Sequence, residues 1–541
     1  MNKSNLPWQV CLGAFLLLGL IIGPAFKANS QYYYESVPRF GQMAPFGSVR
    51  SMGMGGAQVS MGAESAGQGI NPASPALLRK SEMVFGLSPF LNSTENTFKN
   101  GLVTGDKTGL PIGNFSVAFV DQKSETEGGD FRNGVFTISY NRQAIYNRKS
   151  NWEGDVNAQT GPGQFSPNSM IDVFLNNSNK PGYYPNDILA ANPDNQLFFF
   201  DNFKNDLVMA YNAYLLDTTG GQFVSAFPVS DLTKSGFVDQ KLLMGAWNFG
   251  YSVNYQNKLF LGASFEYQRG SYSSEVSYGE TIRNVYVESS NPNFNYLQGF
   301  KGVNFQLIRK YSSEKKGVSG NLGLIYRISD AFRLGLSYQL PSYVWVNETY
   351  TPEVSYNFLG LADWNNRNIL LGSDRVTWVN NQFGYTLRLP SRIRVGATWI
   401  AGKKGMLSAD LEYTDLTKAR LTNGDGNYNF ISENVLVRNQ FQSSISIRGG
   451  GELRLGQLRL RAGAAYTPGS LRSGSTYFNN IHGDELWLTG GLGARFDTWF
   501  WDAALVVGKW NTKFTYDSRL KENVSSDVTS TQLRIGLGFF L

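Results

Sequence analysis

The chain ends with the stretch STQLRIGLGFFL, residues 530–541. Successive side chains of a β-strand point to opposite faces, so every second residue shares a face. One face of this strand is wholly apolar and carries Leu533, Ile535, Leu537, Phe539 and Leu541. The opposite face carries Arg534, two glycines and Phe540. An apolar face backed by small and polar residues is typical of a strand that separates lipid from the lumen of a membrane β-barrel.

The same alternation recurs along most of the chain and predicts further strands. A soluble β-sandwich would carry charges on its outward face, whereas here the more apolar face is aromatic or aliphatic in strand after strand. We therefore predict an all-β fold, an antiparallel transmembrane β-barrel of about 14 strands, with short periplasmic turns and long outer loops. The predicted strands lie near 82–92, 112–121, 132–143, 240–255, 258–278, 316–328, 331–348, 382–400, 404–420, 437–454, 457–468, 484–497, 500–514 and 528–541.

The first 30 residues have the pattern of a secretory signal peptide. Lys3 precedes an apolar run at 10–22, which is too short for a membrane span, and 28–30 is a small-x-small cleavage site. We expect the mature chain to begin at Gln31 and to be located in the outer membrane of a Gram-negative bacterium. The only cysteine, Cys11, lies in this leader, so we expect a mature protein without disulfides or thiolate metal sites.

Charge and motif content argue against several other classes of protein. The formal net charge of +6 is mild and evenly spread, which argues against a nucleic-acid partner. The single histidine, His482, has no neighbouring cluster with metal-ligand spacing. The stretch GLVTGDKTG, 101–109, resembles a phosphate loop only in part, because Asp106 precedes Lys107 and no helix follows. We expect no catalysis, no cofactor and no metal.

A Gly-rich stretch of low charge, GMGGAQVSMGAESAGQGINPASPALL at 53–78, precedes the first strand. A barrel of about fourteen strands is too wide for its own side chains to fill. We therefore expect residues 31–80 to fold back as a plug inside a barrel formed by 81–541, with Gly53, Gly55 and Gly56 as flexible points. Asn71, Pro72 and Ala73 should form a rigid turn, because Pro fixes φ and Asn can bond to its own backbone.

The predicted inward faces repeat arginines and acids. A buried charge must be paired, so a structural salt-bridge network is one interpretation. The other is that some arginines receive the carboxylate of a ligand. The candidates for such contacts are Arg333, Arg394, Arg448 and Arg461.

A long insertion is predicted at 144–238, between the third and fourth strands. Long loops of this kind are usually functional or disordered. Three interpretations stay open: a small subdomain that buries its own apolar residues, a hydrophobic capture surface or lid, and a docking surface for a protein partner. The apolar residues concerned are Leu197, Phe198, Phe199, Phe200, Phe203, Leu207 and Tyr211.

Several segments in order resemble the FadL family of outer-membrane transporters. These are the 53–78 stretch with its Asn-Pro-Ala turn, NLGLIYRISDAFRLGLSYQLPS at 321–342, LPSRIRVGATW at 389–399 with LSADLEYTDL at 407–416, and IRGGGELRLGQLRLRAGAAYTP at 447–468. The resemblance covers most of 47–541. It implies capture of a hydrophobic small molecule, such as a long-chain fatty acid or an aromatic hydrocarbon, by outer loops. It also implies binding beside the plug and sideways release into outer-membrane lipid next to a kinked third strand. The long 144–238 insertion departs from the family pattern.

Two other functions stay open at this point. The chain could anchor or shuttle a secreted protein through the 144–238 insertion. It could also be a general diffusion porin, although a plug argues against that function.

Overall fold

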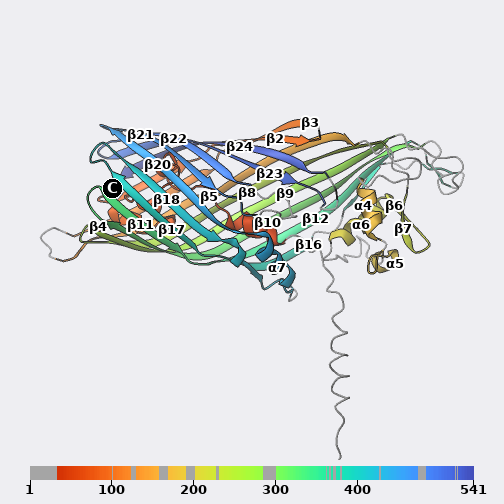
Figure 1. Cartoon of the computed structure of the whole chain (residues 1–541), viewed down its shortest axis with the longest axis horizontal. Coiled ribbons are helices and arrows are strands. Elements are labelled where there is room, and N and C mark those ends of the chain that lie inside the picture. The colour runs from red at the N-terminus through yellow and green to blue at the C-terminus, as the bar shows by residue number, and fades with distance from the viewer. Residues whose placement is uncertain are drawn as a thin grey trace, which may run out of the picture.

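The computed structural model describes residues 33–541, apart from 100, 124–128, 157–168, 179, 190–201, 227–230, 284–299, 361, 365–366, 370–372, 378–380, 426–427, 473–482, 518–519 and 521. The expected leader and His482 lie outside the described residues. Figure 1 shows a long barrel with the C-terminus at one end, which we call the proximal end. Within the described residues, no helix is long and apolar enough to cross a membrane.

Fourteen antiparallel strands close the barrel, as predicted. Each strand pairs with the next, and the first strand pairs with the last, Glu82 lying opposite Phe540. The ring runs through β1 (Glu82–Leu87), β4 (Ile112–Gln122), β5 (Phe131–Val156), β8 (Asp231–Tyr255), β9 (Leu259–Arg283), β10 (Phe300–Arg327), β11 (Phe332–Gln339), β17 (Arg392–Ile400), β18 (Gly405–Asp415), β20 (Ser443–Leu455), β21 (Leu458–Thr467), β22 (Glu485–Arg495), β23 (Trp499–Phe514) and β24 (Val524–Phe540).

Four prolines interrupt strands that continue toward the distal end. Proline lacks a backbone N–H and breaks the ladder. Pro89 separates β1 from β2 (Phe90–Phe98), and Pro111 separates β3 (Gly101–Gly109) from β4. Pro341 separates β11 from β12 (Ser342–Gly360), and Pro390 separates β16 (Asn381–Leu389) from β17. Residues 101–109, whose sequence resembles a phosphate loop in part, form strand β3 and not a phosphate-binding loop before a helix.

An apolar belt surrounds the barrel. Every strand of the ring exposes at least one large apolar side chain, as Phe85, Phe119, Phe136, Phe249, Phe265, Leu322, Leu336, Val395, Leu411, Ile447, Leu460, Leu488, Leu505 and Leu537 do. Such a belt is the lipid-facing surface of a barrel that spans a bilayer.

Several strands are longer than the sequence predicted. Strands β5, β8, β9 and β10 have 26, 25, 25 and 28 residues, whereas about 9–11 residues cross a bilayer. The extra length is at the distal end, where the outward residues are polar and give no lipid-facing signal. As a result β5 continues to Val156 and β8 begins at Asp231, so both ends of the predicted 144–238 insertion are strand.

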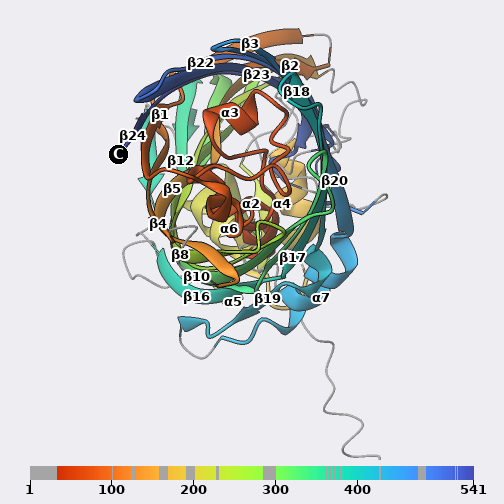
Figure 2. The same cartoon turned by 90° about the vertical axis from the view of Figure 1, so that its left-hand side faces the viewer.

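The N-terminal residues 33–78, which we call the inner segment, lie inside the ring of strands (Figure 2). They form short helices joined by turns: η1 (Tyr33–Glu35), α2 (Ser36–Gly41), α3 (Val49–Met52), η2 (Ala66–Gly69) and η3 (Ser74–Leu77). Most of these residues are buried. The position matches the expectation that this part of the chain folds back into the barrel.

A second group of short elements, which we call the cap, packs at the distal end (Figure 1). It consists of α4 (Met170–Ser178), α5 (Pro185–Ile188), α6 (Asn202–Asn212), β6 (Leu216–Thr219) and β7 (Gln222–Ser225). Its apolar side chains share one buried cluster with inward residues of the long strands, such as Phe305 and Val354, and with Tyr516 of the β23–β24 connection. The cap and the inner segment therefore pack in two separate apolar clusters.

Candidate functional site

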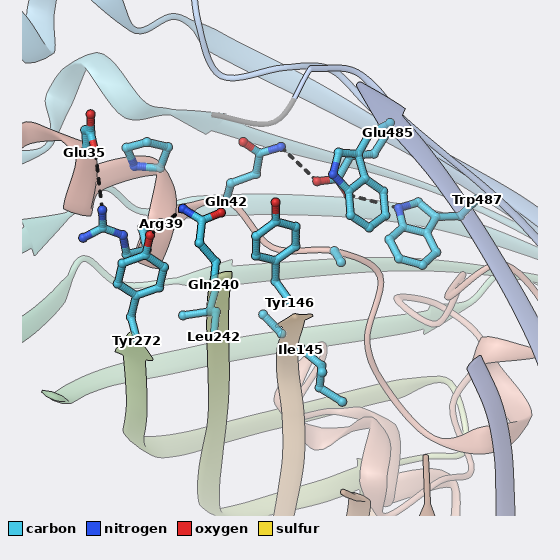
Figure 3. Close-up of a pocket in the computed structure, with 14 residues that line it drawn as sticks. Glu35, Arg39, Gln42, Ile145, Tyr146, Gln240, Leu242, Tyr272, Glu485 and Trp487 are labelled. Atoms are coloured by element: carbon cyan, nitrogen blue, oxygen red, sulfur yellow. Dashed lines mark hydrogen bonds and ion pairs between the residues drawn. The ribbon is translucent and has the colours of Figure 1, made fainter. Parts of the chain in front are cut away.

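A pocket lies inside the barrel between α2 and the wall (Figure 3). Its apolar side is formed by Tyr146, Leu242, Trp487 and Trp510. The ring centroids of Trp487 and Trp510 are 5.8 Å apart, and those of Tyr146 and Trp510 are 6.1 Å apart. Pockets that bind small apolar molecules are typically lined in this way, by aromatic side chains with a few polar groups at fixed positions.

Arg39 of α2 supplies the positive charge of the pocket. Its guanidinium pairs with Glu35 at 3.4 Å and lies 3.9 Å from the ring centroid of Tyr272 (Figure 3). It also donates to the Tyr311 hydroxyl at 3.2 Å. A guanidinium over an aromatic face is stabilised by the ring quadrupole. Arg39 is thus oriented by three neighbours at the polar edge of an aromatic pocket.

One wall carboxylate, that of Glu485, ties the inner segment to the pocket wall. It accepts hydrogen bonds from Gln42 Nε2 at 3.2 Å and from Trp487 Nε1 at 3.0 Å (Figure 3). These bonds fix the indole plane of Trp487, and they make the wall of the pocket sensitive to the position of α2.

We expect the Glu35 carboxyl to make the stability of the inner segment depend on pH. Burial raises the pKa of Glu35 to about 7, from an ordinary value of 4.5; Arg39 opposes this shift and Glu348 adds to it. A group whose pKa is raised on folding stabilises the fold below its unfolded pKa, and this contribution is lost as pH rises through the folded pKa. The thermal midpoint of the wild type should therefore fall relative to that of Glu35→Gln as pH rises from about 4.5 to about 7. An unchanging difference across this range would contradict the assignment.

The wall changes course directly beside the pocket. The ladder between β4 and β5 ends where Asn114 lies opposite Asn141, and the register of β5 against β8 shifts between Arg142 and Ala144. Such a bulge bends the strand that carries it. Ala144 lines the pocket, so the bend lies at the pocket itself.

Beyond the bend, β5 runs on the inner side of the hairpin formed by β2 and β3. Asn92 of β2 donates to the backbone oxygen of Asn147 at 2.9 Å, and Arg148 donates to Ser526 of β24 at 2.6 Å. A Cβ on Gly105 of β3 would collide with the backbone oxygen of Lys149, so glycine permits this close crossing. In the part of the chain that the structure describes, β3 and β5 share no ladder, and the hydrogen-bonded wall is interrupted here.

The predicted turn at Asn71, Pro72 and Ala73 lies against the wall. The Asn71 Oδ1 atom accepts from the backbone N–H of Ala73 at 3.0 Å, which is the local bond expected from the sequence. The Asn71 Nδ2 atom donates to the Val59 oxygen at 2.7 Å. A Cβ on the inward Gly262 or Gly323 would meet the backbone of this turn. Inward glycines thus let the turn contact the barrel.

The three predicted flexible glycines of the inner segment also contact the wall. Gly55 and Gly56 have φ of +71° and +79°, a left-handed conformation that favours glycine. The Gly55 N–H donates to Thr489 Oγ1 at 2.9 Å, and Gly53 lies against Gly491. Their role as flexible points stays a prediction.

The four candidate arginines lie apart from the pocket lining. Arg394 and Arg448 pair with Glu412 at 2.7 and 3.1 Å. Arg461 pairs with Glu452 at 2.9 Å and with Asp502 at 2.7 Å, while Arg333 donates to the backbone oxygen of Met61 at 2.9 Å. Arg394, Arg448 and Arg461 thus belong to a salt-bridge network, the first of the two interpretations, whereas Arg333 has no ion pair among the described residues. Contact with a ligand head group stays a prediction for these residues.

The predicted capture residues are only partly described. Leu197, Phe198, Phe199 and Phe200 lie outside the described residues, and Phe203 is described only as part of the α6 backbone. Leu207 is buried in the cap, and Tyr211 packs against the same cluster. Leu207 therefore faces the interior, and a capture role for it would require the cap to open. Whether the cap also binds a protein partner stays a prediction.

The pocket residues on the inner segment were not among the predicted site residues. A signal was present in YYYESVPRF, 32–40, where Glu35 and Arg39 are four residues apart within an aromatic run. This spacing places both side chains on one face of a helix. The wall residues Tyr146 and Trp487 carry no comparable signal, because any inward aromatic residue fits the alternating pattern.

Comparison with known proteins shows the fold. No protein-family model matches the chain, and no curated protein matches it. Among solved structures, the P. putida toluene transporter TodX is similar over 92% of this chain and 99% of its own, with a TM-score of 0.50 and 12% identity. A Pseudomonas aeruginosa FadL homologue is similar over 92% of this chain and 99% of its own, with a TM-score of 0.52 and 11% identity. The chain thus has the barrel fold of the FadL and TodX structures, as the sequence resemblance implied.

Proposed function

We propose that this chain is an outer-membrane transporter that moves hydrophobic small molecules inward, without catalysis. The observation that carries the proposal is the aromatic pocket, with Arg39 at its edge, located where β5 leaves the wall. The distal end faces the cell exterior, because the connections there are long while the proximal turns are short. The fold shared with a toluene transporter and a FadL homologue supports a role in transport.

The cargo is an aromatic hydrocarbon or a long-chain fatty acid. Tyr146, Trp487 and Trp510 offer apolar contact to a ring or an acyl chain, and Arg39 offers a charge to a carboxylate. The cap would open to admit the cargo from outside. The inner segment acts as a plug that blocks straight passage. Its rearrangement would let the cargo leave sideways, past the bulge of β5 and beneath β3, into the membrane. Burial of apolar surface drives the binding.

Filling the pocket beside the bulge should block uptake. Replacing Ala144 with tryptophan adds volume where the cargo would pass, and overpacking typically costs about 1–3 kcal/mol, so we expect uptake to fall by about tenfold or more. Initial uptake of radiolabelled toluene and of oleate by cells expressing each variant measures this. Leu505→Trp, on the lipid-facing surface, is the matched control. Equal uptake by Ala144→Trp and wild type would contradict the proposed route.

A further inference from the structure

A helix replaces a wall strand on the side of the barrel opposite the β5 bulge. The three-residue strand β19 (Arg420–Thr422) pairs with β16, whereas β20 begins only at Ser443, opposite Asp415 of β18. Helix α7 (Ile431–Gln440) fills the interval, and an isolated bridge joins Phe441 to Leu471 (Figure 1). Among the described residues, no strand pairs with the free edge of β19.

One side chain attaches the helix to that free edge. Asn434 Oδ1 accepts from the backbone N–H of Leu421 at 2.9 Å, and Asn434 Nδ2 donates to the backbone oxygen of Leu421 at 2.9 Å. The carboxamide thus takes the place of a neighbouring strand at a single residue. An ordinary strand pair in this barrel has a bond ladder along its whole length, so this part of the wall is held by far fewer bonds.

The exposed face of α7 is mixed, with Ile431 and Val435 beside Ser432, Arg438 and Asn439, and it lies at the level of the membrane interface. Leu421 of β19 lies opposite Leu387 of β16. The next residue of β16, Arg388, lies opposite Tyr343 of β12, so β19 is at the level of Tyr343. Tyr343 and Trp345 are 47% and 50% exposed, as in the aromatic girdle that marks the interface of a membrane barrel. On α7, Ile431 and Val435 are one turn apart and 68% and 38% exposed. These two side chains form the apolar part of the exposed face.

The inner face of α7 connects to the pocket through apolar contacts. Val437 and Phe441 are fully buried, and the rings of Phe441 and Tyr34 have centroids 6.3 Å apart. Both residues belong to the same continuous cluster as Tyr146 and Trp487 of the pocket. A continuous chain of packed apolar side chains therefore joins the helix to the pocket.

The closed position of α7 buries a carboxylate that is satisfied only in part. Glu433 is buried, and one of its oxygens accepts from the Tyr428 hydroxyl at 2.7 Å. Its other oxygen, Oε2, has no hydrogen-bond partner among the described residues. A buried polar atom without a partner disfavours the state that buries it, so the closed helix is weakened at its inner face.

We infer that α7 is a lateral portal through which apolar molecules dissolved in the outer leaflet reach the lumen pocket. The portal is distinct from the β5 bulge and supplies cargo that has already partitioned into the membrane. Asn434 is its clasp and Ile431 and Val435 are its lipid-facing surface. The inference rests on the proposed function, because a portal has meaning only if the pocket binds such molecules.

A disulfide across the clasp tests the portal. The only natural cysteine lies in the expected leader, and the Asn434 carboxamide already touches the Leu421 backbone, so Leu421→Cys with Asn434→Cys places two thiols across the joint. The protein is placed in nanodiscs with 4-fluorotoluene, and ¹⁹F exchange NMR measures transfer between the bilayer-dissolved and protein-bound signals. Leu411→Cys with Ile447→Cys is the control, because these lipid-facing residues lie opposite each other in an ordinary strand pair.

Oxidation of the clasp pair should slow the exchange to the rate of the remaining route past the β5 bulge, and reduction should restore it, because a covalent bridge removes the open state of α7 from the ensemble. The control pair should exchange equally fast in both redox states. Asn434→Ala, which removes the clasp without a bridge, should exchange faster than wild type. Exchange unaffected by oxidation of the clasp pair would overturn the portal. Absence of any bound signal in the wild type would instead overturn the proposed function.

Discussion

Replacing Glu412 with alanine should destabilise the barrel by about 3–5 kcal/mol, the usual cost of removing one partner from a buried ion pair. Glu412 is buried on β18 and contacts three guanidinium groups: those of Arg392 at 2.9 Å, Arg394 at 2.7 Å and Arg448 at 3.1 Å. Without the carboxylate, three buried positive charges would face one another in the lumen. The substitution should therefore cost more than the loss of a single isolated pair.

Denaturant unfolding in detergent, followed by the heat-dependent shift of the barrel on electrophoresis, would measure this loss. Asp497→Asn is a suitable control, since Asp497 is an exposed acid in the turn between β22 and β23. The control should change stability by less than about 0.5 kcal/mol. A Glu412→Ala protein as stable as the control would show that the arginines are neutralised by some other means.

Replacing Arg309 with alanine should release the cap. Arg309 of β10 pairs with Asp206 of α6 at 2.5 Å and donates to the backbone oxygen of Tyr516 at 3.0 Å, and its guanidinium lies 4.0 Å from the Tyr516 ring centroid. Asp206 is buried, so removing this cation should weaken docking of the cap by about 3–5 kcal/mol. That change raises the population of the undocked state by a factor of about one hundred or more.

Hydrogen exchange of the α6 amides in nanodiscs would detect the change, because exchange of a docked helix reports its local opening. Lys180→Ala, an exposed residue of the same cap, is the control and should leave protection unchanged. If the cap admits cargo, Arg309→Ala should also speed uptake of external toluene. Unchanged protection of α6 would mean that the apolar cluster alone holds the cap.

The barrel could be predicted because lipid imposes a strict alternation on every strand of the belt. The same rule explains where the prediction stopped. Beyond the membrane the outward residues of β5 and β10 are polar, so the sequence no longer shows the apolar alternation of a strand. The backbone pairing of these strands with their neighbours nevertheless continues. The segment at 437–454 was predicted as one strand, yet 431–440 is helix α7 and β20 begins at Ser443. Val437 begins a spacing of apolar residues that also fits a strand, whereas in the structure Asn434 attaches this segment to Leu421 as a helix.

The site was less accessible to sequence reasoning. The turn at Asn71 follows from local chemistry, because Asn bonds to its own backbone and Pro fixes φ. The pocket combines Arg39 with wall residues about 100 to 450 positions away, such as Tyr146 and Trp487, and no local pattern specifies such distant neighbours. The arginines were predicted to face inward, but which acid each one meets depends on the register of neighbouring strands.

The pairing of β1 with β24 has a consequence for biogenesis. This contact joins Glu82 to Phe540, so it is among the last to become favourable as the chain is assembled. The inner segment is covalently attached just ahead of β1 and is held by wall groups from distant strands, including Thr489 and Asn141. We therefore expect it to enter the nascent cylinder before the seam forms. Sealing then traps it, and a chain whose N-terminal residues arrive late would become an empty, misassembled product.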